Sequence, residues 1–172
     1  MSAPFTDDAL GEVLPRLRRF ALSLAQDPAS ADDLVQSCLE TALSRAASRR
    51  PDGDLRAWLF SILYRRFLDG RRRATRYARI LDFFGGAEPP TAPSTETVAM
   101  ARAALGDLGR LPADQQSVLL LVSVEGLGYQ EAADVLGIPI GTVMSRLSRA
   151  RKALRALNEG RIVSQPALRI LK

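Results

Sequence analysis

The side chains of this chain that are best suited to binding a charged ligand are those of its arginines, and these gather in two places. Seven arginines fall between Arg65 and Arg79, opposed only by Asp69. A second group of five basic residues, with no acid among them, runs from Arg146 to Arg155. Guanidinium groups bind phosphate oxygens and guanine edges, so both groups are typical of nucleic-acid binding. Each could also be an ordinary solvated helix face, and the charges alone leave that alternative open.

Aromatic residues are interleaved with the first arginine group or lie just before it. They are Trp58, Phe60, Tyr64, Phe67 and Tyr77. Rings next to arginines can stack on bases that have left a duplex. Most of these rings could equally belong to a hydrophobic core, and Trp58 is expected there. The segment is therefore a candidate for contact with an opened DNA strand.

The composition argues against catalysis. The 172 residues include no histidine, which removes the commonest metal ligand and general base. The single cysteine, Cys38, excludes an intramolecular disulfide and, on its apolar stripe, is expected in the core. We expect no catalytic residue, no metal site and no cofactor. The net charge of +5 favours a polyanionic partner such as nucleic acid.

Neither a membrane span nor a secretory signal is visible. No apolar run approaches the roughly 20 residues that a membrane-spanning helix needs. The first ten residues, MSAPFTDDAL, lack a basic start and an apolar stretch. We expect a cytoplasmic protein without membrane insertion.

Apolar residues in the first half recur at helical spacing. The pattern predicts a helix from Leu10 to Ala25, whose first turns Pro15 should weaken. Ser30 and Asp33 resemble a capping box that starts a second helix, which runs to about Ala47. A loop rich in Pro, Gly and Asp follows, and a third helix begins near Leu55 and continues into the arginine group.

The periodicity stops between Phe83 and Thr97, where Pro, Gly, Ser and Thr concentrate. This composition predicts a flexible linker, which could reach about 50 Å when extended. The predicted fold class is all-α, with two small helical domains. Their bounds are 1–82 and 98–160, with the linker at 83–97 and a tail at 161–172.

The second domain has the pattern of a helix-turn-helix. A helix from Val98 to Leu108 and another from Pro112 to near Gly126 are predicted first. A short helix over 129–136, a turn at Gly137 and a helix extending to Leu157 then complete the motif. The polar face of that last helix, suited to a major groove, carries Ser145, Arg146, Ser148, Arg149 and Lys152.

Three segments, in order and with the right separation, resemble the extracytoplasmic-function group of the bacterial sigma-seventy family. They are ADDLVQSCLETAL at 31–43, RAWLFSILYRRFLD at 56–69, and LPADQQSVLLLVSVEGLGYQEAADVLGIPIGTVMSRLSRARKALR at 111–155. The resemblance implies an RNA polymerase sigma factor that directs promoter-specific initiation, in a stress or environmental response under the control of an anti-sigma factor. The first domain would be region 2-like and the second region 4-like.

The resemblance also implies roles for residues of the first domain. An edge of the second helix would bind the beta-prime clamp helices of core polymerase, and the residues of this edge are Asp33, Leu34, Gln36 and Ser37. The beta flap of the polymerase would be a further contact of the protein. Ser37 replaces the usual Glu, so one charge contact is expected to be missing. The minus-ten element would be held by Arg49, Arg50, Arg65, Arg66, Asp69, Arg71, Arg72 and Arg73. Arg65 replaces a usual Asn, which changes the expected minus-ten sequence.

In the second domain the resemblance places the minus-thirty-five contacts on the helix-turn-helix at 129–149 and just beyond it. The groove residues would be Met144, Ser145, Arg146, Ser148, Arg149 and Lys152. Met144 stands where Arg or Lys is common and cannot form a bidentate contact with guanine. We expect a changed base preference there, toward a thymine methyl group.

Two other functions stay as alternatives. A free-standing helix-turn-helix repressor or activator would bind an operator without polymerase and should form symmetric dimers. An enzyme acting on nucleic acid would use Asp32, Asp33 and Glu40 as metal ligands, and should gather further carboxylates from elsewhere on the chain.

Overall fold

The computed structural model describes residues 7–48, 53–83 and 93–159, and every regular element in those ranges is helical. The all-α prediction is confirmed. The first half comprises α1 (Asp7–Ala25), α2 (Pro28–Ser44), a short turn η1 (Ala46–Ser48) and α3 (Leu55–Phe83). The second half comprises α4 (Thr95–Leu105), η2 (Gly106–Arg110), α5 (Ala113–Leu119), η3 (Leu120–Val124), α6 (Tyr129–Leu136) and α7 (Ile140–Asn158).

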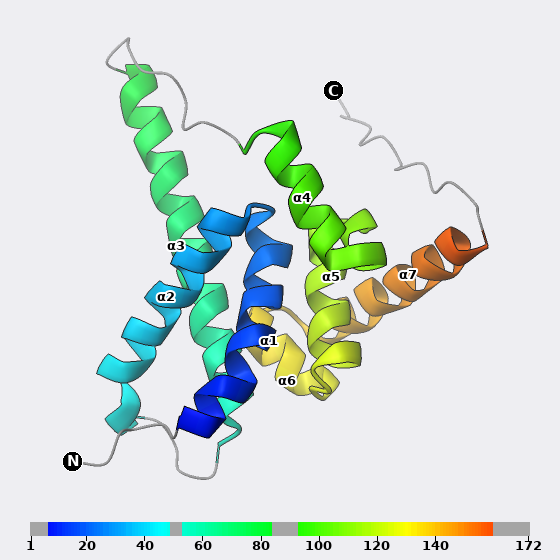
Figure 1. Cartoon of the computed structure of the whole chain (residues 1–172), viewed down its shortest axis with the longest axis horizontal. Helices are drawn as coiled ribbons and strands as arrows, with labels where there is room; N and C mark the ends of the chain where they lie inside the picture. Colours follow the sequence, from blue (N-terminus) through cyan, green and yellow to red (C-terminus); the bar gives the residue numbers. More distant parts are fainter. Residues whose placement is uncertain (1–6, 49–52, 84–92, 160–172) are drawn as a thin grey trace.

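The first three helices pack side by side, and α3 extends beyond the other two (Figure 1). The apolar stripe predicted for α1 is buried, from Val13 through Leu17 to Phe20. The ring of Phe20 meets Phe60 of α3 edge to face, with 5.3 Å between centroids. Cys38 is fully buried, as predicted, while Trp58 is half-buried against the core.

The helix starts differ from the predicted ones for local reasons. Helix α1 begins at Asp7 and continues through Pro15, which is exposed, so water can bind the carbonyl that loses its partner. Helix α2 is capped by Asp27 rather than Ser30, because the Asp27 carboxylate accepts the Ser30 backbone N–H at 2.7 Å. Pro28 then occupies the first helical position, where proline is favoured. The capping box predicted at Ser30 is wrong.

The predicted linker is partly helical. Ser94 caps α4 by accepting the backbone N–H of Thr97 at 3.1 Å, so the helix starts at Thr95, inside the predicted linker. Residues 84–92 of that linker lie outside the described residues. Gly109 lets η2 lie directly against the backbone of Arg102, where a side chain would collide. Because η2 takes over after Leu105, α4 ends before the predicted Leu108.

The helix-turn-helix is confirmed. Helix α6 ends at Gly137, whose left-handed backbone (φ 63°, ψ 36°) glycine adopts readily. Glu131 accepts the Gly128 backbone N–H at 2.7 Å and fixes the start of α6. Ala133 of α6 is buried, and its small side chain lets another helix pack closely against it. No helix among the described residues is long and apolar enough to cross a membrane.

The two halves are in contact, which the sequence did not predict. Helix α3 packs against α6, and α1 packs against α4 and α5. One cluster of buried apolar side chains contains residues of both halves, such as Leu17 and Leu63 from the first and Leu121 from the second. Figure 1 shows α6 lying beside the lower part of α3.

Candidate polymerase-binding and DNA-binding surfaces

The predicted polymerase-binding edge lies on α2. Asp33 and Gln36 are exposed, while Leu34 and Ser37 are half-buried. Leu34 packs against the core, and the Gln36 amide donates to Glu40 at 3.1 Å. The helix therefore presents a polar edge above an apolar stripe, an arrangement suited to docking on another helix.

The neighbouring carboxylate Asp32 already has a partner. Arg18 of α1 donates two hydrogen bonds to it, at 2.6 and 3.1 Å. The hydrogen bond from Arg18 holds the pKa of the Asp32 carboxyl below its ordinary value. In the described parts of the chain no three His, Cys, Asp or Glu side chains gather as a metal site would require. Asp32 thus joins α1 to α2 rather than forming a ligand set with Asp33 and Glu40.

The predicted minus-ten residues are found in different surroundings. Arg49 and Arg50 lie outside the described residues. Arg65 is exposed, whereas Arg66 is half-buried and donates to the Thr41 hydroxyl from Nε and Nη2, at 2.8 and 2.5 Å. Thr41 belongs to α2 and is itself buried. Arg66 therefore connects α3 to α2, and its guanidinium is not freely available to DNA.

Farther along, α3 carries the exposed arginines. Arg71, Arg72 and Arg73 are exposed, as are Arg76 and Arg79, to which the resemblance gave no role. Arg72 lies 3.7 Å from Asp69, and Arg71 lies over the Phe67 ring at 5.8 Å from its centroid. This segment is the part of α3 that extends beyond the bundle (Figure 1). Its arginines are free to approach a phosphate backbone from several sides.

The exposed face of α7 carries most of the predicted minus-thirty-five residues. Ser145, Ser148, Arg149 and Lys152 are exposed, and Met144 is 51% exposed. The exception is Arg146. Its Nε lies 3.3 Å from the Asp114 carboxylate of α5, and its side chain is only 26% exposed. A contact between Arg146 and a base would require this ion pair to give way.

The sequence analysis missed three residues that line a groove along this face, two of them on α7 and one, Tyr129, at the start of α6. Tyr129, Arg151 and Arg155 join Met144 and Ser148 along a shallow groove. Arg151 and Arg155 follow Met144 by seven and eleven residues, a spacing that returns to one face of a helix. That spacing could have shown that they share the face of Met144.

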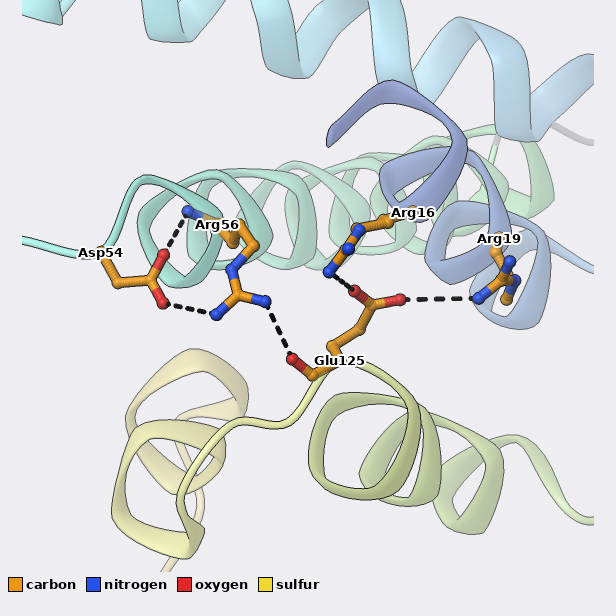
Figure 2. Close-up of polar contacts among 5 residues, drawn as sticks. All are labelled: Arg16, Arg19, Asp54, Arg56 and Glu125. Carbon is orange, nitrogen blue, oxygen red and sulfur yellow. Dashed lines mark hydrogen bonds and ion pairs between the residues drawn. The ribbon is translucent and has the colours of Figure 1, made fainter. Parts of the chain in front are cut away.

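The contact between the two halves is centred on Glu125, which sequence reasoning also missed. Its carboxylate lies 3.4 Å from Arg16 and 3.7 Å from Arg19, both on α1 (Figure 2). The backbone carbonyl of Glu125 accepts a hydrogen bond from Arg56 of α3 at 3.2 Å, and Arg56 is also paired with Asp54 at 3.1 Å. The signal available in the sequence was a single acid at the end of the apolar run VLLLVSV.

Comparisons with known proteins identify the family of this chain. Residues 108–154 match the family described as Sigma-70, region 4, and residues 10–64 match the Sigma2 domain of PhyR. The chain is 36% identical over 157 residues to the ECF RNA polymerase sigma factor EcfG of Rhodopseudomonas palustris, covering 90% of this chain and 87% of that protein. The chain belongs to the extracytoplasmic-function sigma factors. This sigma factor therefore directs promoter-specific initiation by core RNA polymerase, as its resemblance implied.

Further relatives are consistent with the assignment. The sigma factor SigM of Mycobacterium tuberculosis is 33% identical over 144 residues, or 83% of this chain and 71% of that protein. Among solved structures, RpoE in complex with the anti-sigma factor NepR from Bartonella quintana matches with a TM-score of 0.67 and 34% identity, over 88% of this chain and 95% of that one. CnrH in complex with the cytosolic domain of CnrY matches at 0.57 and 27%, over 92% of each chain.

Proposed function

We propose that this sigma factor docks on core polymerase through the α2 edge formed by Asp33, Leu34, Gln36 and Ser37. The observation that supports the proposal is the exposure of Asp33 and Gln36 above a half-buried apolar stripe. The factor itself performs no catalysis in this scheme, because polymerase makes the RNA and the sigma factor selects the promoter. Its place of action is then the cytoplasm, with the polymerase.

The experiment is run-off transcription with purified core polymerase on genomic promoter fragments. The double variant Asp33→Arg/Gln36→Ala should lose the promoter-specific transcripts that the unchanged chain supports. Asp107→Arg makes the same charge reversal at an exposed position of η2 and serves as the control. Equal transcription by both variants would contradict the α2 assignment. Absence of transcripts with the unchanged chain, together with tight operator binding, would favour a free-standing repressor or activator.

We infer that residues 1–82 and 98–160 divide promoter recognition between them, with the tail 161–172 outside both. The exposed arginines of α3 bind the minus-ten region, where base stacking and phosphate contacts offset the cost of unstacking. The face of α7 binds the minus-thirty-five region. A guanidinium in a major groove selects guanine, whereas the exposed thioether of Met144 is compatible with a thymine methyl group. A base-substitution panel tests this, and a guanine requirement opposite Met144 would contradict it.

An anti-sigma factor is the proposed regulator. Support comes from the relatives of known structure, RpoE and CnrH, which were solved with the anti-sigma factor NepR and with the cytosolic domain of CnrY. A candidate anti-sigma protein from the same genome should bind this chain and suppress the run-off transcripts. Transcription that persists at saturating concentrations would exclude that candidate.

A further inference from the structure

The part of α3 that extends beyond the bundle carries charge of one sign only (Figure 1). Between Gly70 and Ile80 there are five arginines and no acid. Every residue of this segment except Ala78 is exposed. A helix surface of this charge is complementary to a polyanion such as DNA.

One face of the same segment is apolar. Tyr77 and Ile80 are 59% and 48% exposed, and they line a shallow groove together with Arg73, Ala74 and Arg76. Residues three apart are neighbours on a helix surface, so the Tyr77 ring and the Ile80 side chain lie next to each other. These two side chains lose their contact with water only when a partner covers them. The face therefore combines an apolar pair with flanking positive charges.

The order of the chain determines which part of the promoter this face meets. The end of α3 leads into the half that reads the minus-thirty-five element, and the chain between Phe83 and Thr95 can reach about 40 Å. The names of the two elements place them about 25 base pairs apart, or roughly 85 Å along B-DNA. Because the joining chain is much shorter than this separation, the end of α3 points toward the minus-thirty-five element.

The length of the helix then gives the position of the apolar pair on the DNA. Tyr77 follows Arg65, which is assigned to the minus-ten element, by twelve residues. This is about 18 Å along a helix, or about five base pairs of duplex. Tyr77 thus reaches the DNA just upstream of the minus-ten element.

The width of a helix determines which groove of the duplex it can enter. An α-helix with its side chains is about 10–12 Å across, which fits the major groove of about 12 Å but not the minor groove of about 6 Å. In the major groove, thymine presents a methyl group to apolar side chains. Arginine side chains beside the apolar pair can meanwhile bind phosphate oxygens.

We propose that Tyr77 and Ile80 contact thymine methyl groups in the major groove just upstream of the minus-ten element, while Arg73 and Arg76 bind the adjacent phosphates. The inference rests on the minus-ten and minus-thirty-five assignments proposed above and adds a double-stranded contact region between them. Tyr77 and Ile80 are then specificity-determining residues for this region. A promoter with thymines there binds the complex of polymerase and sigma factor more tightly than a promoter without them.

Deoxyuridine templates test the methyl contact, because deoxyuridine differs from thymidine only by the missing methyl group. Binding of the polymerase–sigma complex to a promoter fragment is measured by gel mobility shift. Replacing the thymines in the first five base pairs upstream of the minus-ten element should weaken binding by about fourfold for each contacted methyl group. The double variant Tyr77→Ala/Ile80→Ala should bind the thymine fragment about tenfold more weakly and show no further loss with deoxyuridine.

A matched control removes apolar side chains of similar exposure from the second half. Met100 and Val124 are 59% and 45% exposed. The variant Met100→Ala/Val124→Ala should bind the thymine fragment as the unchanged chain does and keep the deoxyuridine effect. Circular dichroism checks that both double variants are folded.

Three results would overturn the proposal. The unchanged chain could bind thymine and deoxyuridine fragments equally, or the Tyr77→Ala/Ile80→Ala variant could keep the full deoxyuridine effect. That variant could also lose affinity for core polymerase without DNA, in which case the face docks on protein. Failure of the underlying minus-ten assignment would appear separately, because base substitutions within the minus-ten element of the same fragment would then leave binding by the unchanged chain unaltered.

Discussion

Arg66 offers the sharpest test of whether a residue implied to bind DNA instead holds the fold together. Its guanidinium donates twice to the Thr41 hydroxyl, and that hydroxyl in turn donates to the Ser37 carbonyl at 2.8 Å. Thr41→Val keeps the shape of the side chain and removes the acceptor. Arg66→Met keeps much of the apolar stem and removes the donors. Each change alone should disrupt the same contact between α2 and α3.

The expected loss of unfolding free energy follows from the hydrogen bonds between Arg66 and Thr41. A hydrogen bond to a charged group contributes about 1.5–3 kcal/mol, and Arg66 is only half-buried, so water can replace part of it. We expect each variant to lose about 1–2 kcal/mol of unfolding free energy, which lowers Tm by about 2–8 °C for a chain of this length. Because both remove one contact, the double variant should lose little more than either alone, leaving a coupling of about 1 kcal/mol.

Urea unfolding of the unchanged chain, the two single variants and the double variant, monitored by circular dichroism, gives the coupling free energy directly. Thr41→Ser, which keeps the hydroxyl, is the matched control and should show a smaller loss. The reasoning is refuted if the coupling is zero while Arg66→Met abolishes promoter opening at an unchanged Tm. Arg66 would then act on DNA, and its bond to Thr41 would be incidental.

Three further outcomes follow from local features. Burial raises the pKa of the Cys38 thiol to about 12, so iodoacetamide should label it at pH 8 only after unfolding, and rapid labelling of the folded chain would contradict its burial. Hydrogen bonds from Ser30 lower the pKa of the Asp27 carboxyl. The Asp27 cap therefore contributes its full stabilisation at pH values above the ordinary carboxyl pKa near 3.9. This stabilisation is lost as the pH falls through the lowered pKa of Asp27 in the folded chain. Asp27→Ala should therefore lower Tm by about 2–4 °C at pH 7 and have little effect at pH 2, as thermal melts across pH can show. Gly137→Ala should cost about 1 kcal/mol from backbone strain alone, since nothing lies near the added carbon. Gly109→Ala should cost more, because the added side chain would meet the Arg102 backbone. Equal losses of unfolding free energy for the two glycine variants in urea would contradict this explanation.

The sequence predicted the helices well because burial imposes a period on the chain. The stripes of α1 and α7 repeat every three to four residues, and the turn at Gly137 needs a left-handed residue, so both are visible without a structure. Helix starts were harder, since Asp27 and Ser30 are both good caps and only the backbone decides between them. The edge with Asp33 and Gln36 came from the family resemblance, and both side chains are exposed in the structure.

Contacts between distant residues could not be predicted in this way. Arg16 and Glu125 are separated by 109 positions, and no repeat relates them. Likewise, the presence of an arginine at position 66 does not show whether its side chain faces DNA or the Thr41 hydroxyl. Both outcomes depend on how the helices pack, which a pattern along one chain does not contain.

The shared core of the two halves has a consequence for how the chain unfolds. Each half has only some 65 to 80 residues, a size at which a single core gives marginal stability. While Leu121 and its neighbours remain in one cluster with Leu17 and Leu63, the halves should unfold in one cooperative transition. Once separated, they should unfold independently, the second at a lower denaturant concentration. Promoter DNA or polymerase would then raise the stability of the helix-turn-helix half by mass action, so this half is most susceptible to proteolysis when it is neither packed on the first half nor bound to its target.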